Sequence, residues 1–464
     1  MLTLCKQNKN IMLNKIKNKL LDNILMCNVN LIDEILLSMS KEGFIDHLGN
    51  SIEDKRQYNS IVPLSLIILF SVASKMKNKP SMTDIPFAIK NSSTLAKLGY
   101  SGLKSKHRET IFNEGTIRFL LKKYNHDDLI KYYNSYVQNK ILNAINQKPI
   151  IHLLDCTKIA VNYENTNYEN STIALDRKGE SMRGYKLATL RGLTEETGII
   201  EDIRLGTVST HDLKLSEEMI RTSPCFKSGD VLINDRGFIS RELINYMKVV
   251  RGVNTYVPLK RNMEAYTTAI EAAKIKNEWT PHPNRKRKTS VITFIDNLKE
   301  YWVTRAEDEY EDVDFNACVV WDKATDEYFA FITTDLTKSA EEIVRMYELR
   351  PEIEEDYRQL KDFWKLEDFK STKYDVITYH IICVLFGYLF YQLYLSTDSG
   401  RKYIGKSLPC LLKNEYRNEI NEVLLQSGEY FCILDIHDFF ELLLEQENEV
   451  REFILGKFKK ANIA

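Results

Sequence analysis

The change in sequence pattern at Pro149 constrains the fold of this 464-residue chain more than any other feature. Before Pro149, apolar residues recur every three or four positions, which is the spacing of amphipathic helices. After it, we expect short strands at 150–155, 199–208, 231–235 and 255–259, with a helix over 241–250 between the last two. Strands that alternate with helices predict an α/β core built on a mixed, partly parallel sheet.

A second strand-rich block follows a basic loop made of Arg285, Lys286, Arg287 and Lys288. We expect its strands at 290–295, 301–305, 315–321 and 327–333, with a turn over 322–326 that joins the last two into a hairpin. Helical patterns resume at Ser339 and continue to the C-terminus. The pattern therefore predicts a helical N-terminal region (1–148), an α/β core (149–262 and 335–400), a β-rich insertion (263–334) and a helical C-terminal region (401–464).

Charge is distributed unevenly along the chain. The totals, 64 Lys+Arg against 65 Asp+Glu, exclude a uniformly basic nucleic-acid coat. Residues 1–150 hold 22 basic and 12 acidic residues, which leaves 42 basic (64 − 22) and 53 acidic (65 − 12) residues in the remainder. This asymmetry is typical of a polyanion-binding module attached to a module with another task. Lys-rich helices that only keep the surface soluble would give the same count, so charge alone leaves both interpretations open.

Several protein classes are disfavoured by composition. The eight cysteines include no CxxC pair, which argues against a zinc module and a secreted disulfide framework and favours a cytoplasmic protein. The first 21 residues lack the unbroken apolar core of a signal peptide. Residues 376–395 could span a bilayer by length, but Thr378, His380 and Gln392 favour a buried core helix and no membrane contact. No Gly-rich phosphate loop is present, so we expect no nucleotide cofactor.

Two acidic residues directly follow apolar strand patterns: Asp155 in LLDCTK and Asp235 in LINDRG. In open α/β sheets, ligands and metals bind at the edge where the chain leaves the carboxyl ends of the strands. Because a buried carboxylate without a partner is costly, each of these acids must be paired, solvated or metal-bound. A turn-starting Asp that bonds to its own loop is the competing interpretation of each, and a divalent metal site needs a third acid.

The candidate for the third acid lies in the segment 347–361. On one continuous helix, Tyr347, Arg350, Glu354 and Lys361 would fall within about a sixth of the circumference. This stripe suits a metal-bound phosphodiester, because the metal needs the carboxylate and the cations hold the non-bridging oxygens. Pro351 would more naturally begin a new helix. Arg350 would then lie near the N-terminus of that helix, and a helix N-terminus is itself an anion site. The competing interpretation is an ordinary solvated acidic face.

The combination of these motifs resembles bacterial insertion-sequence transposases of the DDE group, of the IS-four type, whose catalytic domain is RNase H-like. The spacing Y-(2)-R-(3)-E-(6)-K starts at Tyr347, and D-x-T at Asp155 and D-R-G-F at Asp235 resemble the first and second acid motifs of that group. The chain order of the regions is also similar. The resemblance covers nearly the whole chain and is weakest in the first 100 residues and after about residue 400. Family members often carry Trp after the arginine, where this chain has Pro351.

By position, the resemblance implies a role for each matched residue. Asp155, Asp235 and Glu354 would bind two divalent metal ions, normally Mg²⁺ with Mn²⁺ as a substitute, and catalyse endonuclease and strand-transfer reactions. The resemblance implies DNA contacts for Tyr347, Arg350, Lys361 and Lys186. The basic loop at 285–288 would contact the DNA backbone.

The function that the resemblance implies is cut-and-paste DNA transposition in the bacterial cytoplasm, at the nucleoid. The N-terminal helices would bind the terminal inverted repeats, the core would cut these ends and join them to target DNA, and a homodimer would form on DNA. Two alternatives stay open. One is an inactive or repurposed derivative that binds DNA without cutting it, and the other is an RNase H-fold nuclease that cuts without joining.

Overall fold

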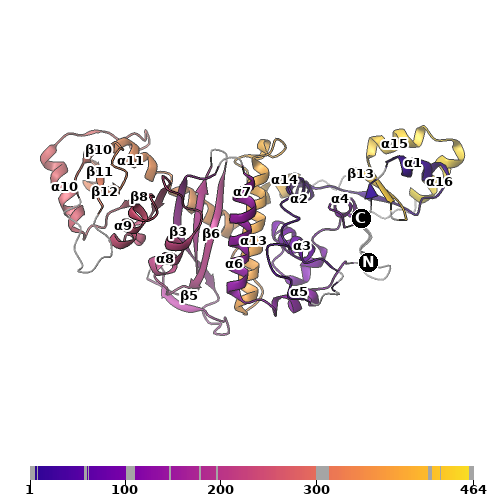
Figure 1. Cartoon of the computed structure of the whole chain (residues 1–464), viewed down its shortest axis with the longest axis horizontal. Helices are drawn as coiled ribbons and strands as arrows, with labels where there is room; N and C mark the ends of the chain where they lie inside the picture. Colours follow the sequence, from indigo (N-terminus) through magenta and orange to yellow (C-terminus); the bar gives the residue numbers. More distant parts are fainter. Residues whose placement is uncertain are drawn as a thin grey trace. The chain divides into compact units, whose positions relative to one another are not determined.

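The computed structural model describes all residues except 1–5, 8, 57–59, 61, 101–109, 146–147, 177–178, 195–196, 299–312, 416–420, 429 and 459–464. The chain forms two compact units, and Figure 1 labels many of their elements. The large-sheet unit consists of 130–361 and 372–374, and the small-sheet unit consists of 1–129, 362–371 and 375–464. The strand expected at 301–305 lies outside the described residues.

A ten-stranded mixed sheet is the centre of the large-sheet unit. Its order is β4-β5-β3-β7-β8-β12-β11-β10-β9, and β6 also pairs with β5. The strands are β3 (Ile151–Val161), β4 (Thr172–Leu175), β5 (Ser181–Leu193), β6 (Gly198–Thr207), β7 (Val231–Asn234), β8 (Asn254–Pro258), β9 (Thr280–Pro281), β10 (Ser290–Ile295), β11 (Asn316–Asp322) and β12 (Glu327–Thr333). Strands β3, β7 and β8 run parallel, and the other neighbours are antiparallel. The predicted α/β class with a mixed sheet is confirmed.

Amphipathic helices flank this sheet. They are α8 (Asp212–Thr222), α9 (Arg241–Val249), α10 (Glu264–Lys276), α11 (Ala340–Tyr347) and α12 (Pro351–Arg358), together with α6 (His126–Tyr136), the π-helical turn Val137–Ile141 and α7 (Leu142–Ala144) before β3. Helix α9 connects the parallel strands β7 and β8. Helix α10 places Ala265, Ala269 and Ala273, spaced one helical turn apart, in the core formed with β10, β11 and β12. Small residues at this spacing allow the helix to approach the sheet closely.

The strand-rich block continues the central sheet. Strands β10, β11 and β12 agree with the strands predicted at 290–295, 315–321 and 327–333, and β11 and β12 form the predicted hairpin, with Asp322 opposite Glu327. Strand β12 then pairs with β8, where Ile332 lies opposite Val257. The block is therefore hydrogen-bonded to the α/β core as one sheet.

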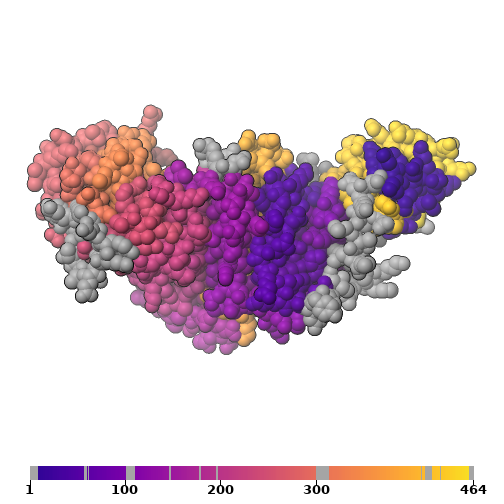
Figure 2. All heavy atoms as spheres, viewed as in Figure 1, coloured from indigo at the N-terminus to yellow at the C-terminus, as the bar shows by residue number. Residues whose placement is uncertain are grey.

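The small-sheet unit corrects two predictions of purely helical structure. Strand β2 (Asn23–Cys27) lies in the N-terminal region, and β13 (Glu422–Ser427) and β14 (Tyr430–Asp435) lie in the C-terminal region. With the two-residue strand β1 (Lys6–Gln7), they form one sheet of order β1-β14-β13-β2, in which Leu25 lies opposite Leu424. Figure 2 shows the N-terminal residues, in indigo, packed among the C-terminal ones, in yellow. The Leu- and Ile-rich runs fit a helix as well as a strand, and pairing across the chain decides between them.

Helices make up the rest of this unit. They are α1 (Lys9–Lys17), α2 (Leu31–Lys41), α3 (Leu64–Met76), α4 (Ser92–Lys97), α5 (Glu114–Leu121), α13 (Tyr374–Leu395), α14 (Leu408–Glu415), α15 (Ile436–Leu444) and α16 (Asn448–Phe458). Among the described residues, α13 is the one helix long and apolar enough to cross a membrane, and 89% of its apolar window is buried within the fold. This burial agrees with the predicted core helix. The boundaries of the four predicted regions stay a prediction.

Candidate active site

Strands β3 and β7 bring the first two acids to neighbouring positions. The parallel pairing of the strands ends with Leu154 opposite Asn234, and Asp155 and Asp235 are the next residues along the chain. The expectation that Asp155 lies at the end of its strand is wrong, because β3 continues to Val161 by pairing with β5 along its whole length. Asp155 nevertheless lies just beyond the β3–β7 pairing, because β7 ends at Asn234, opposite Leu154.

Each of these two carboxylates is fixed by its own backbone. One oxygen of Asp155 accepts a hydrogen bond from the main-chain N–H of Cys156 at 2.8 Å, and one oxygen of Asp235 accepts from the N–H of Arg236, also at 2.8 Å. The local bond that was the competing interpretation is therefore present at both residues. It occupies only the Oδ1 atoms, and both Oδ2 atoms face Arg350.

The third carboxylate comes from helix α12. Helix α11 ends at Tyr347, and Pro351 begins α12, as expected for a proline at the first helical position. Arg350 is the residue immediately before α12, and Glu354 lies one turn into the helix. Glu354 Oε1 lies 2.7 Å from Arg350 Nη1.

The Arg350 guanidinium contacts all three carboxylates. Its Nη2 lies 3.2 Å from Asp155 Oδ2 and 3.5 Å from Asp235 Oδ2, and its Nη1 bonds to Glu354. The arginine side chain is 13% exposed, and its Nε has no hydrogen-bond partner among the described residues. Three negative groups thus surround one positive group, so the cluster carries a formal charge of −2 when all are ionised.

Burial changes the acidity of the first carboxyl. It raises the pKa of Asp155 to about 6, although the positive charge of Arg350 and the N–H of Cys156 act in the opposite direction. Asp235 and Glu354 raise the same pKa further because they are negative. A carboxyl with a pKa near 6 is mostly ionised at neutral pH, and it loses its charge in mild acid.

The donor set suits a hard divalent cation, because carboxylate oxygens are the ligands that Mg²⁺ prefers. Within the described part of the chain, no group of three or more His, Cys, Asp or Glu side chains is arranged to hold a metal ion directly. Instead, a cationic guanidinium stands among the three carboxylates. A positive charge is therefore stabilised at this place, by the same three carboxylates that would hold a cation.

The predicted DNA-contacting residues do not all lie at this cluster. Tyr347 does: burial raises the pKa of its hydroxyl, Arg350 lowers it, and its ring packs on Phe331 with centroids 4.7 Å apart. Lys361 lies in a π-helical turn after α12, where its ammonium donates to the main-chain oxygen of Lys158. The continuous helical stripe is therefore wrong, because α11 ends at Tyr347 before α12 begins at Pro351, and the helix changes its winding again before position 361.

Lys186 is also bound to groups other than the three carboxylates. It lies on β5, is 7% exposed, and donates to the Thr210 carbonyl and to Asp212 Oδ1, the latter at 2.6 Å. Its partner Asp212 begins helix α8. The ammonium thus joins the turn after β6 to α8, and neither of its hydrogen-bond partners is one of the three acids.

The basic loop at 285–288 is exposed and lies beside the junction of α11 and α12. Glu348, which follows Tyr347, accepts a hydrogen bond from Asn284 at 2.8 Å and pairs with Arg287 at 3.7 Å. The loop connects β9 and β10. Its positive charges are therefore held next to the segment that carries Arg350.

Three residues that the sequence interpretation did not single out tie α12 to the sheet. Tyr357 donates to the main-chain oxygen of Asp155 at 2.7 Å and bonds to Thr189 at 2.6 Å. Arg191 pairs with Asp356 at 2.5 Å and with Glu352 at 2.8 Å. Tyr357 follows Glu354 by three residues, so its place near the acid could be read from helical spacing, but its two partners could not.

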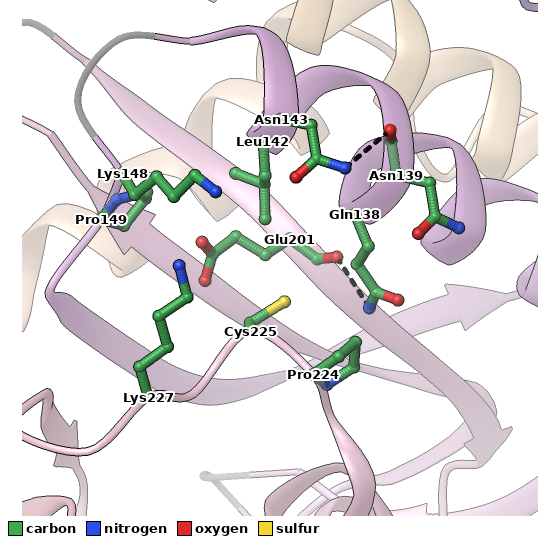
Figure 3. A pocket seen from close by; sticks show the side chains of 10 residues that line it. All are labelled: Gln138, Asn139, Leu142, Asn143, Lys148, Pro149, Glu201, Pro224, Cys225 and Lys227. Carbon is green, nitrogen blue, oxygen red and sulfur yellow. Dashed lines mark hydrogen bonds between the residues drawn. The ribbon is translucent and has the colours of Figure 1, made fainter.

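A separate cavity lies at the other end of β3 and β7. It has a volume of about 220 Å³ and is lined by residues that precede these strands, such as Lys148 and Lys227, and by Glu201 and Cys225 (Figure 3). Gln138, on the π-helical turn, donates to the main-chain oxygen of Glu201. None of the three carboxylates lines this cavity, so it is distinct from the candidate active site.

Comparison with known families gives one match. The family described as Transposase DDE domain matches residues 153–390, which is 238 of 464 residues (390 − 153 + 1). The matched region contains Asp155, Asp235, Glu354 and Arg350. The mixed sheet flanked by helices is consistent with the RNase H-like fold of such enzymes. No curated protein matches the chain.

Proposed function

Because this chain belongs to the Transposase DDE domain family, we propose that it performs cut-and-paste transposition of a bacterial insertion sequence, with Asp155, Asp235 and Glu354 as its catalytic carboxylates. The observation that carries the proposal is the convergence of these three residues, from β3, the residue after β7, and α12, on one guanidinium. These residues lie 80 and 119 positions apart in sequence (235 − 155 and 354 − 235), and all three contact Arg350. The Y-(2)-R-(3)-E-(6)-K spacing supports the IS-four type.

The three carboxylates would hold two Mg²⁺ ions, or Mn²⁺ as a substitute. When bound, these ions supply activation of a water or of a DNA 3′-hydroxyl and stabilise the leaving oxygen. The protein contributes the fixed direction of the ligands, since backbone N–H groups hold Oδ1 of both aspartates. Their Oδ2 atoms then remain directed at the centre of the cluster.

Positive groups around the cluster suit a phosphodiester substrate. Arg350 carries a charge that could hold a non-bridging phosphate oxygen, and Tyr347 lies beside it. The exposed loop at 285–288 adds four cations next to this segment, where they would follow a DNA backbone. Lys361 and Lys186 would reach DNA only after leaving their present partners.

We further propose that the N-terminal helices bind the terminal inverted repeats and that the protein acts as a homodimer on DNA at the bacterial nucleoid. Cut-and-paste transposition brings two ends together, and a dimer supplies one active site for each end. The basic excess of residues 1–150 supports DNA binding by this region.

The decisive test uses Glu354→Gln, which keeps the size of the side chain and removes its charge. We expect it to abolish Mg²⁺-dependent cleavage of DNA that carries the element's ends while leaving DNA binding intact. Glu355→Gln is the matched control, because Glu355 lies next in the helix but pairs with Arg358 on the exposed side. Cleavage by Glu354→Gln at the control rate would remove the assignment.

The two alternative functions give different products. A derivative that only binds DNA would shift end-bearing DNA in a binding assay and leave it uncut. A nuclease on the same fold would cut the ends but give no strand-transfer product from a precleaved 3′ end. Joined products from that substrate are expected for the transposase.

A further inference from the structure

Tyr357 links two of the elements that carry the proposed catalytic carboxylates. It lies on α12, three positions after Glu354, and is 6% exposed. Its hydroxyl donates to the main-chain oxygen of Asp155 at 2.7 Å. One hydrogen bond therefore joins the residue that carries the first carboxylate to the helix that carries the third.

The direction of each bond follows from counting protons. A tyrosine hydroxyl has one proton, and the carbonyl of Asp155 can only accept. The proton of Tyr357 therefore goes to Asp155, and Thr189 donates its own proton to the Tyr357 oxygen at 2.6 Å. Thr189 is fully buried and lies opposite Asp155 in the β3–β5 register. The hydroxyl proton of each of these two residues thus has an acceptor in the protein interior.

Two ion pairs also hold α12 on β5. Arg191, two residues after Thr189, shares its face of β5 and pairs with Asp356 and Glu352. These pairs hold the helix on β5, but neither reaches β3. The Tyr357 hydroxyl, in contrast, connects α12 directly to Asp155, at its main chain rather than at its carboxylate.

We infer that Tyr357 is a positioning residue that sets Glu354 relative to Asp155, with Thr189 orienting its hydroxyl. This role rests on the proposed function, since it assumes that these carboxylates hold a divalent cation together. Groups that orient metal ligands without touching the metal commonly change metal affinity by about 10- to 100-fold when they are removed. The hydroxyl is positioned to act in this way.

The experiment measures Mn²⁺ binding to the full chain by electron paramagnetic resonance of the free ion, without DNA. We expect Tyr357→Phe, which removes only the hydroxyl, to weaken Mn²⁺ binding about tenfold. In end cleavage, the Mg²⁺ concentration for half-maximal rate should rise by a similar factor, and excess metal should restore the maximal rate. Tyr133→Phe is the matched control: it is also buried and donates to a strand carbonyl, that of Ile200, at 3.0 Å.

The outcomes distinguish the positioning role from the proposed function. If Glu354→Gln loses Mn²⁺ binding while Tyr357→Phe binds Mn²⁺ as the wild type does, the positioning role is overturned and the proposed function stands. If Glu354→Gln also binds as the wild type does, the carboxylate metal site fails, and the positioning role fails with it. Should Tyr357→Phe not fold, Thr189→Val carries the test, because it removes the donor to Tyr357; wild-type affinity would then overturn the role.

Discussion

The buried imidazole of His152 allows a quantitative prediction about the stability of the large sheet. His152 lies on β3 with no exposed surface; its Nδ1 is 2.7 Å from Glu201 Oε2, and its Nε2 is 3.2 Å from Asp230 Oδ2. Burial alone would lower the pKa of this imidazole. The two carboxylates outweigh burial and raise the pKa from 6.5 to about 9. His152 is therefore an imidazolium at neutral pH.

The magnitude follows from the difference in pKa between the folded and unfolded states. A change from 6.5 to about 9 corresponds to about 3–4 kcal/mol, because each unit of pKa difference is worth about 1.4 kcal/mol. A group with a raised pKa gives its full stabilisation below the unfolded value. The contribution of His152 should therefore be complete below pH 6.5 and disappear as the pH rises from 6.5 through 9.

The perturbation is His152→Gln, which keeps a hydrogen-bond donor but not the charge. At pH 6.5 we expect the substitution to lower the opening free energy by about 3 kcal/mol, because removal of the imidazolium leaves two buried carboxylates without a cation. The assay is hydrogen exchange of the β3 and β7 amides, converted to an opening free energy at pH 6.5 and pH 9. From pH 6.5 to pH 9, the opening free energy of the wild type should fall by about 3 kcal/mol more than that of the variant.

A second buried histidine serves as the control. Burial lowers the pKa of His380 to about 3, so this imidazole is neutral at both pH values. His380→Gln should leave the pH dependence of the α13 amides unchanged. Equal pH slopes for the wild type and His152→Gln would refute the charged state assigned to His152.

Three further predictions concern the first carboxylate and the packing around it. Since burial raises the pKa of Asp155 to about 6, Mn²⁺ binding should weaken by up to about tenfold per pH unit below pH 6, as measured by paramagnetic resonance between pH 5 and 8. Gly184→Ala would place a Cβ 2.0 Å from the Ile159 carbonyl oxygen and should destabilise the β3–β5 ladder by about 1–3 kcal/mol, visible as a lower melting temperature. Asp356→Asn removes the charge opposite buried Arg191 and should cost about 3 kcal/mol in a denaturant titration, and an unchanged midpoint would contradict the buried pair.

The sequence was sufficient to indicate the strands that bring Asp155 and Asp235 together, because burying a carboxylate is costly and an acid directly after an apolar run therefore indicates a partner or a ligand. It was not sufficient for β5, the thirteen-residue strand beside β3. Its sequence interrupts apolar residues with Arg183, Lys186 and Arg191, which are polar residues that a surface segment would also carry. Lys186 and Arg191 are buried through ion pairs with distant acids, and such partners are visible only in three dimensions.

The sequence indicated which residues form the acidic cluster, and it did not indicate the electrostatics of the cluster. Spacing along the chain indicated Glu354 and Arg350 together, but it could not show that the guanidinium contacts all three carboxylates. It also placed Lys361 on the same stripe, which fails because a π-helical turn follows Arg358. Helical periodicity assumes constant winding, and a single wider turn is enough to redirect the next side chain.

The sheet shared by the two ends of the chain has a consequence for biosynthesis. Leu25 on β2 pairs with Leu424 on β13, 399 residues later (424 − 25), so a nascent polypeptide on the ribosome cannot complete this sheet until translation is almost finished. A premature stop codon before β13 would leave β2 as an uncovered strand edge, which invites aggregation. Truncated gene copies are therefore expected to yield insoluble products rather than soluble fragments that interfere with the full-length protein. Expression of residues 1–400 would show which of these occurs.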